Sequence, residues 1–216
     1  AHPYWPLFDL EVRTPRLTLR YIDDELAAEL TALAERGVHD PATMPFVIPW
    51  TDLEPPEFGY SSMQFHWRNR AELSPAAWTI GFATIVEGTV VGTTDLLAKD
   101  FPKLRRFETG SWLGLEYQGR GIGKEMRLAT LTFGFDALGA VEATTGAWAD
   151  NEASLGVTKS LGYEYTGTGR KLRRGEPDVH LDYRMGREHF AGLRRDDIEV
   201  IGAESVRSQL GLGSLS

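Results

Sequence analysis

The chain has 216 residues, a net charge of −8 and no cysteine. That length fits one domain, or one domain with an appendage, around a full apolar core. The acidic balance argues against nucleic-acid binding, and the missing cysteines exclude disulfides, thiolate nucleophiles and cysteine zinc sites. No run approaches the roughly 18 apolar residues of a membrane helix, and no signal-peptide pattern is visible. We therefore expect a cytoplasmic protein that binds no membrane.

Apolar spacing predicts the elements, with alternation indicating strands and three- and four-residue spacing indicating helices. In chain order we expect a strand at 17–22, helices at 23–37 and 56–73, two strands within 77–98, a strand at 106–117, a helix at 124–139, a strand at 141–147, a helix at 151–162 and a strand at 178–185. Asp23 or Asp24 can cap the first helix, and Glu87-Gly88 predicts a tight hairpin turn. This order predicts an α/β domain with a mixed, mostly antiparallel central sheet flanked by helices, and not a doubly wound fold.

Two segments fall outside these regular elements. Residues 38–58 hold five prolines among apolar side chains, which predicts an ordered loop of the kind that shapes a binding site. Residues 188–216 are predicted to be a C-terminal helical extension with a flexible Gly/Ser-rich tail. Residues 188–210 could pack on a second copy of the chain, which would make a homodimer.

The most informative stretch is YQGRGIGK, residues 117–124, between a predicted strand and a strong helix. A P-loop would need glycine at Gln118 and a hydroxyl at Glu125, so that motif fails twice. A dinucleotide fingerprint would need its third glycine at Lys124, so it fails as well. The loop belongs to neither class of nucleotide binder.

The pattern that remains is Q-x-x-G-x-G, from Gln118 to Gly123. Such a loop presents backbone N–H groups at a helix N-terminus, where the helix dipole favours an anion. Gly121 and Gly123 remove side chains that would block a diphosphate, and Arg120 and Lys124 add positive charge. The alternative is a glycine-rich connection without a ligand.

This loop resembles the Q/R-x-x-G-x-G/A signature with which the GNAT superfamily of N-acetyltransferases holds the pyrophosphate of acetyl-CoA. FETGSWL (107–113) and NEASLGVTKSLGY (151–163) also resemble segments of the branch that acetylates the N-termini of ribosomal proteins. The resemblance covers residues 12–187 and implies a single GNAT-like domain. It also implies direct acetyl transfer, in a ternary complex, to a primary amine of a protein N-terminus or of a small molecule.

By this resemblance the acetyl-CoA site lies in two segments, the strand-to-helix loop and the start of the following short helix. Its expected residues are Leu113, Leu115, Gln118, Gly119, Arg120, Gly121, Ile122, Gly123, Lys124, Asn151 and Ser154. Backbone groups near Leu113 and Leu115 would pair with the pantetheine arm, and the N–H of Leu113 could polarise the acetyl oxygen. Asn151 would bond a pantetheine amide, unless it is simply a helix N-cap.

The resemblance implies that Ser154 lies near the sulfur and protonates the leaving thiolate. Many superfamily members place a tyrosine seven residues after the asparagine for this task, but this chain has Thr158 there. Ser154, a water, Tyr163 or another residue would then supply the proton. The alternative for Ser154 is a capping or solvent-facing serine.

Glu108 is the expected general base, acting through water with a pKa raised by burial. The alternative is an exposed strand glutamate, and Glu72, Glu87 and His66 are weaker candidates. We expect residues 44–50 and the helix at 56–73 to form the acceptor pocket.

The remaining motifs carry less information. The five histidines show no metal-ligand spacing, so we expect no metal. RKLRR (170–174) could bind the 3′-phosphate of the cofactor or an acidic acceptor, although a solvated hairpin tip is favoured. A non-catalytic CoA-binding or sensor module, or a partner-binding scaffold, are the alternatives to an enzyme.

Overall fold

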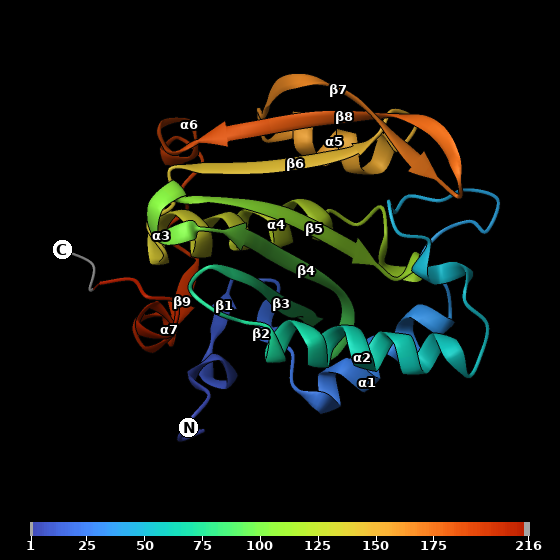
Figure 1. Cartoon of the computed structure of the whole chain (residues 1–216). Coiled ribbons are helices and arrows are strands. Elements are labelled where there is room, and N and C mark those ends of the chain that lie inside the picture. The colour runs from blue at the N-terminus through green and yellow to red at the C-terminus, as the bar shows by residue number, and fades with distance from the viewer. Residues whose placement is uncertain (1, 214–216) are drawn as a thin grey trace.

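The computed structural model describes residues 2–213 and contains one nine-stranded sheet in the order β7-β8-β6-β5-β4-β3-β2-β1-β9 (Figure 1). The strands are β1 (Glu11–Arg13), β2 (Thr18–Tyr21), β3 (Ala77–Val86), β4 (Thr89–Lys99), β5 (Arg106–Leu113), β6 (Glu142–Trp148), β7 (Glu164–Arg173), β8 (Glu176–Gly186) and β9 (Glu199–Ile201). All neighbouring strands are antiparallel except β5 and β6. The predicted mixed, mostly antiparallel α/β domain is confirmed.

Helices cover both faces of this sheet. They are α1 (Asp24–Glu35), α2 (Glu57–Ala71), α3 (Phe101–Leu104), α4 (Ile122–Thr132), α5 (Glu152–Ser160), α6 (Arg187–Ala191) and α7 (Ala203–Gln209), with short turns η1 (Pro6–Asp9), η2 (Trp50–Asp52), η3 (Leu115–Tyr117) and η4 (Phe133–Ala137). None of the helices in residues 2–213 has the length and apolarity that spanning a bilayer requires.

The face that α4 covers, called the α4 face below, holds the main core. Phe82 and Phe107 pack edge-on against Phe133 and Phe135, which continue α4 as the π-helical turn η4. Because these rings are fully buried, α4 is fixed firmly against β3 and β5.

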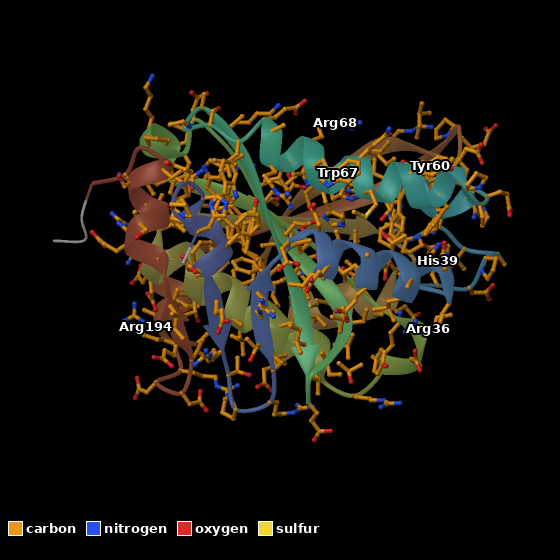
Figure 2. All side chains as sticks on the ribbon, turned by 90° about the horizontal axis from the view of Figure 1, so that it is seen from below. Arg36, His39, Tyr60, Trp67, Arg68 and Arg194 are labelled. Atoms are coloured by element: carbon orange, nitrogen blue, oxygen red, sulfur yellow. The ribbon has the colours of Figure 1, made fainter. Side chains whose placement is uncertain are left out.

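The opposite face, called the α2 face below, is covered by α1 and α2 (Figure 1). Only Phe58 of α2 is buried, whereas Tyr60 and Trp67, labelled in Figure 2, are exposed. Trp67 and Arg70 hold α2 to α1 by donating to Asp24. The α2 face is therefore less tightly covered than the α4 face.

Two local predictions from the sequence are confirmed, the cap of the first helix and the turn between β3 and β4. The carboxylate of Asp23 accepts from Leu26 N at 2.9 Å and caps α1. Glu87 and Gly88, with φ of 49° and 78°, form the predicted turn between β3 and β4.

The C-terminal segment differs from the predicted helical extension. Residues Glu199–Ile201 form β9, which pairs antiparallel with β1, another strand that the sequence pattern missed. Phe190 of α6 and Val206 of α7 are fully buried. The described part of this segment thus completes the sheet and its core, while residues 214–216 of the predicted flexible tail lie outside the described residues.

The basic cluster 170–174 fastens the proline-rich loop to the sheet. Arg173 bonds Asp150 and Asp178, and also donates to the carbonyl of Met44. Arg174 forms a two-pronged ion pair with Asp52. These two cations are thus neutralised by aspartates, which differs from a freely solvated hairpin tip.

Candidate active site

The candidate site is built where β5 and β6 separate. The two parallel strands pair only from Arg106–Glu142 to Glu108–Thr144, and beyond that point they diverge (Figure 1). We call the Glu108–Thr144 pair the apex of the splay. The gap beyond it leaves backbone groups of both strands without a strand partner, so it can accept an extended ligand as a pseudo-strand.

The odd-numbered residues of β5 turn their backbone groups toward this gap. Thr109 O accepts from Thr145 Oγ1 of β6 at 3.4 Å, and Leu113 O accepts from Gln118 Nε2 at 2.9 Å. Leu113 therefore lies at the mouth of the gap, with its carbonyl bonded to Gln118. The structure differs at Leu115, whose N–H donates to Gly37 O and whose carbonyl accepts from Gln118 N, so that its backbone is already paired.

The glycine loop leads directly into the N-terminus of α4. Gly119 and Gly121 adopt left-handed φ of 72° and 76°, which side chains other than glycine rarely tolerate. Gly121 is the N-cap residue, and no side chain caps the first turn. Arg16 holds the loop by donating to the Arg120 carbonyl at 3.0 Å. No side chain therefore occupies the first-turn N–H groups of α4, as an anion site would require.

The other loop residues divide between ligand-facing and structural positions. The side chains of Arg120 and Lys124 are exposed beside the helix N-terminus. Gln118 is also exposed but bonds the carbonyls of Val38 and Leu113, while Ile122 is buried in the core. Gly123 packs near Leu113, where an added Cβ would meet Leu113 Cδ1 at 3.8 Å.

The N-terminus of α5 lies beyond the strand β6. Asn151 caps it, because its side chain accepts from Ser154 N at 3.2 Å. Ser154 is half-buried, and Thr158 is almost fully buried on the same helix. Asn151 is therefore a helix N-cap, which was the alternative interpretation of this residue. The bond uses the backbone N–H of Ser154 and not its hydroxyl.

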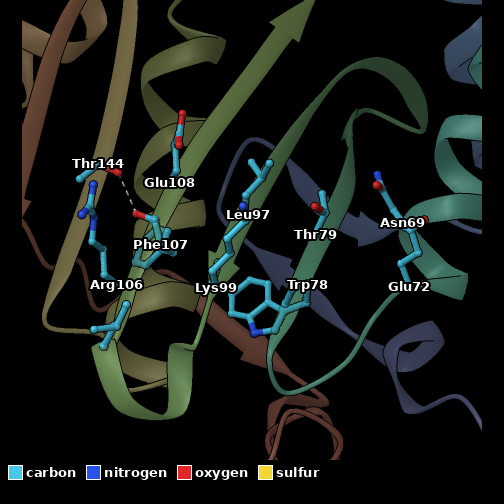
Figure 3. A pocket seen from close by; sticks show the side chains of 13 residues that line it. Asn69, Glu72, Trp78, Thr79, Leu97, Lys99, Arg106, Phe107, Glu108 and Thr144 are labelled. Carbon is cyan, nitrogen blue, oxygen red and sulfur yellow. Dashed lines mark hydrogen bonds between the residues drawn. The ribbon is translucent and has the colours of Figure 1, made fainter.

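Glu108 lines a cavity of about 440 Å³ on the α2 face, directly at the apex (Figure 3). Thr144, Leu97 and Thr79 line its floor, and Asn69 and Glu72 of α2 line its edge. The Glu108 side chain is exposed, which differs from the burial expected for it. A carboxylate in an open cavity can still accept a proton through water.

The predicted acceptor pocket is only partly reproduced. The C-terminal turn of α2 contributes to the cavity, but residues 44–50 pack elsewhere. Phe46 contacts Trp50, which stacks obliquely on Trp112, and the Phe46 carbonyl accepts from Trp148 Nε1. This aromatic group forms a wall on the α2 face beyond the apex.

On the α2 face, glycine and aspartate residues of neighbouring strands lie side by side just beyond the apex. Asp95 of β4 lies between Gly81 of β3 and Gly110 of β5, and Gly146 of β6 lies beside Asp182 of β8. Burial raises the Asp95 pKa to about 7. Sequence reasoning missed this carboxyl, although a charged residue inside an otherwise apolar strand was a visible signal.

Two histidines also face this side of the molecule. His180 is buried, and its Nδ1 lies 2.9 Å from an Asp182 oxygen. His66 belongs to α2, and burial lowers its pKa to about 4, so His66 is neutral at physiological pH. No three His, Asp or Glu side chains in residues 2–213 cluster as a metal site would require.

Fold and site together define a protein that can hold an anionic group at a helix N-terminus and an extended arm between two parallel strands. The family model described as an acetyltransferase (GNAT) domain matches residues 16–164. The chain belongs to the GNAT acetyltransferase family and is an N-acetyltransferase of that fold. Acetyl-CoA is the acetyl donor that this family uses.

Solved structures share the fold at low sequence identity. A ribosomal-protein-S5-alanine acetyltransferase from Vibrio fischeri is 20% identical with a TM-score of 0.66, over 83% of this chain and 98% of that one. RimL, a ribosomal L7/L12 alpha-N-protein acetyltransferase in complex with coenzyme A, is 16% identical with a TM-score of 0.65, over 80% and 95%. A GCN5-related N-acetyltransferase from Brucella melitensis is 17% identical with a TM-score of 0.67, over 89% and 87%.

Proposed function

We propose that the protein transfers the acetyl group of acetyl-CoA directly to a primary amine in a ternary complex. The observation that carries this proposal is the splay between β5 and β6, whose apex adjoins the Glu108 cavity. The open N-terminus of α4 lies at one end of the gap and the cavity at the other. A donor in the gap and an acceptor in the cavity would meet at the apex, so no acyl-enzyme is needed.

The donor site would use the groups that the structure leaves open. The first-turn N–H groups of α4, with Arg120 and Lys124, would bind the pyrophosphate. The backbone of Leu113 would pair with the pantetheine arm and orient the acetyl oxygen. Asn151, already the cap of α5, would bond a pantetheine amide through its remaining amide N–H groups.

Two side chains would move protons. Glu108 would accept the proton of the attacking amine through water, because its carboxylate faces the cavity at the apex. Ser154, half-buried at the start of α5, would return a proton to the departing thiolate. Before the next turnover, Glu108 would release its proton to water and Ser154 would regain one from water.

The acceptor would be a primary amine of a protein N-terminus or of a small molecule. The two ribosomal-protein acetyltransferases among the structural neighbours favour a protein N-terminus. The carboxylates on the α2 face suit a cationic amine before it loses its proton. Reaction in the cytoplasm, where acetyl-CoA and nascent chains meet, fits this acceptor class.

Calorimetry with acetyl-CoA tests the donor site. We expect Gly121→Glu to abolish binding, since a carboxylate at the N-cap repels the pyrophosphate and φ of 76° strains any side chain. Gly88→Glu is the matched control, because it introduces the same charge at φ of 78° in the β3–β4 turn. Equal acetyl-CoA affinity in the two variants would refute the loop assignment.

Release of CoA in the presence of an amine panel tests catalysis separately. Steady release that depends on an amine supports the enzyme. Tight acetyl-CoA binding without release under any amine would favour the alternative of a sensor module on the same fold.

A further inference from the structure

Unpaired buried polar atoms concentrate at one place in the molecule. In residues 2–213, six buried side-chain nitrogen or oxygen atoms lack a hydrogen-bond partner, and three of them are Thr109 Oγ1, Arg127 Nε and the Tyr163 hydroxyl. The Arg127 guanidinium lies 6.0 Å from the centre of the Tyr163 ring and donates to Thr145 Oγ1 at 3.3 Å. Thr145 Oγ1 in turn donates to Thr109 O. These four residues form one cluster, called the Arg127 cluster below.

Arg127 is the unusual member of this cluster. Its side chain comes from the middle of α4, the residue is 4% exposed, and it forms no ion pair with a described carboxylate. Glu125, two residues earlier on α4, is equally buried but does pair with Arg16. A buried guanidinium without a carboxylate partner destabilises the fold. Its presence therefore calls for an explanation other than stability.

The position of the cluster supplies that reason. Thr109 and Thr145 are the first residues beyond the last paired residues of β5 and β6, Glu108 and Thr144. Their side chains turn to the α4 face, whereas Glu108 turns to the α2 face. An arm that enters at Leu113 and pairs along β5 reaches Thr109 after four residues, about 13 Å of strand. The cluster therefore lies where the end of the arm would stop.

We propose that Arg127 is a catalytic group that binds the sulfur of the donor and balances its charge when it leaves as thiolate. This inference rests on the proposed function. The amine nitrogen bonds to the acetyl carbon, and the carbon–sulfur bond breaks with its electron pair remaining on sulfur. The amine proton passes through water to Glu108, which then releases it to solvent, and the thiolate gains a proton from Ser154, which regains one from solvent. Arg127 donates to the thiolate sulfur before that proton arrives.

Tyr163 and Thr145 act as positioning residues in this arrangement. The Tyr163 ring lies against the guanidinium and limits its movement, and Thr145 holds one of its nitrogens. Arg127 Nε is left without a hydrogen-bond partner in residues 2–213 and is free to donate to a ligand. Residue 158 is a threonine, where many superfamily members have a tyrosine. No tyrosine hydroxyl at that position therefore competes with Arg127 for the sulfur.

Comparison of CoA with CoA that lacks its sulfur tests the inference on binding alone. At one fixed pH, we expect the wild-type protein to prefer CoA by about 10-fold or more, as for a hydrogen bond to a charged group. Arg127→Met should bring the ratio near one while keeping affinity for sulfur-free CoA. Arg127→Lys should restore part of the preference. The ultraviolet absorbance of bound thiolate should appear with wild type and disappear with Arg127→Met.

Stability of the unliganded variants separates a ligand role from a structural role. If Arg127 serves the donor, Arg127→Met should melt at the same temperature as wild type or higher, because it removes an unpaired buried charge. A lower melting temperature that Arg127→Lys rescues, with an unchanged CoA preference, would overturn the inference. Tyr163→Phe provides a second variant, since it removes only one hydroxyl and should fold.

The outcomes distinguish this inference from the proposed function. No binding of either form of CoA by wild type would refute both. Amine-dependent CoA release with the same CoA preference in wild type and Arg127→Met would refute the role of Arg127 alone.

Discussion

The two faces of the sheet at the apex differ in almost every physical property. On the α2 face, the exposed carboxylate of Glu108 lines an open cavity, and Asp95 and Asp182 lie beside glycines of the neighbouring strands. On the α4 face, the Arg127 guanidinium is buried beside the Tyr163 ring and pairs with no carboxylate of residues 2–213. The same two strands therefore present negative charge in an open cavity on one side and positive charge in a closed core on the other.

This difference matches what acetyl transfer requires of the two substrates. An amine acceptor arrives as a solvated cation and must lose a proton, which an accessible carboxylate can take. A thioester releases an anion, which is stabilised best by a fixed cation away from water. A sheet that opens between two strands lets the reacting groups meet while each remains in its own environment.

The largest expected effect on the rate comes from a change of Glu108 on the α2 face. Glu108→Gln should lower the rate of transfer by about 100-fold or more, the usual contribution of a general base, while acetyl-CoA affinity stays near that of wild type. The pH dependence of the rate should lose its acidic limb. If that limb persists in Glu108→Gln and disappears in Asp95→Asn, the base is Asp95 and the exposed Glu108 is not needed.

The next effect concerns stability. Asp95 has a usual pKa of 3.8 that burial raises to about 7, so the folded protein holds this proton more tightly than the unfolded chain. Stability should therefore fall as the pH rises from about 4 to about 7 and then level off. Asp95→Asn removes this loss and should be more stable than wild type by roughly 2 to 4 kcal/mol at the upper end. Urea unfolding of both proteins across that range checks it, and parallel curves would contradict it.

The smallest effect tests whether the open face is the acceptor side. A Cβ at Gly110 would meet no atom within 4 Å, so Gly110→Val should fold normally. Its side chain would occupy the α2 face beside the apex, and the KM for the amine should rise by about 10-fold, the result of a modest steric conflict. The affinity for acetyl-CoA should not change. A raised KM for acetyl-CoA with an unchanged KM for the amine would assign this face to the donor.

Features that depend on a few adjacent residues could be predicted well. The cap at Asp23, the turn at Glu87-Gly88 and the glycine loop all follow from backbone requirements that one or two side chains meet. Strands of three residues, such as β1 and β9, carry too little alternation to be recognised. They form because they pair with each other at the sheet edge.

Individual site residues were harder to predict than the loop that contains them. Leu115 was expected to offer its backbone, but the turn η3 pairs it with Gly37 and Gln118. Glu108 was expected to be buried, but α2 does not extend over it closely enough to exclude water. Arg127 had no visible signal, because all of α4 from Glu125 to Thr132 is buried and helical spacing cannot mark one position of a fully enclosed helix.

The sequence by itself determined the α/β fold, the glycine loop and the resemblance to the GNAT family, because spacing and glycine content act locally. Only the tertiary structure decided which side chains meet at the apex. Thr109, Arg127, Thr145 and Tyr163 are far apart in the chain, and they become neighbours because α4 packs across two diverging strands. The charge that each face presents is a property of that packing, since burial and pairing depend on the whole fold.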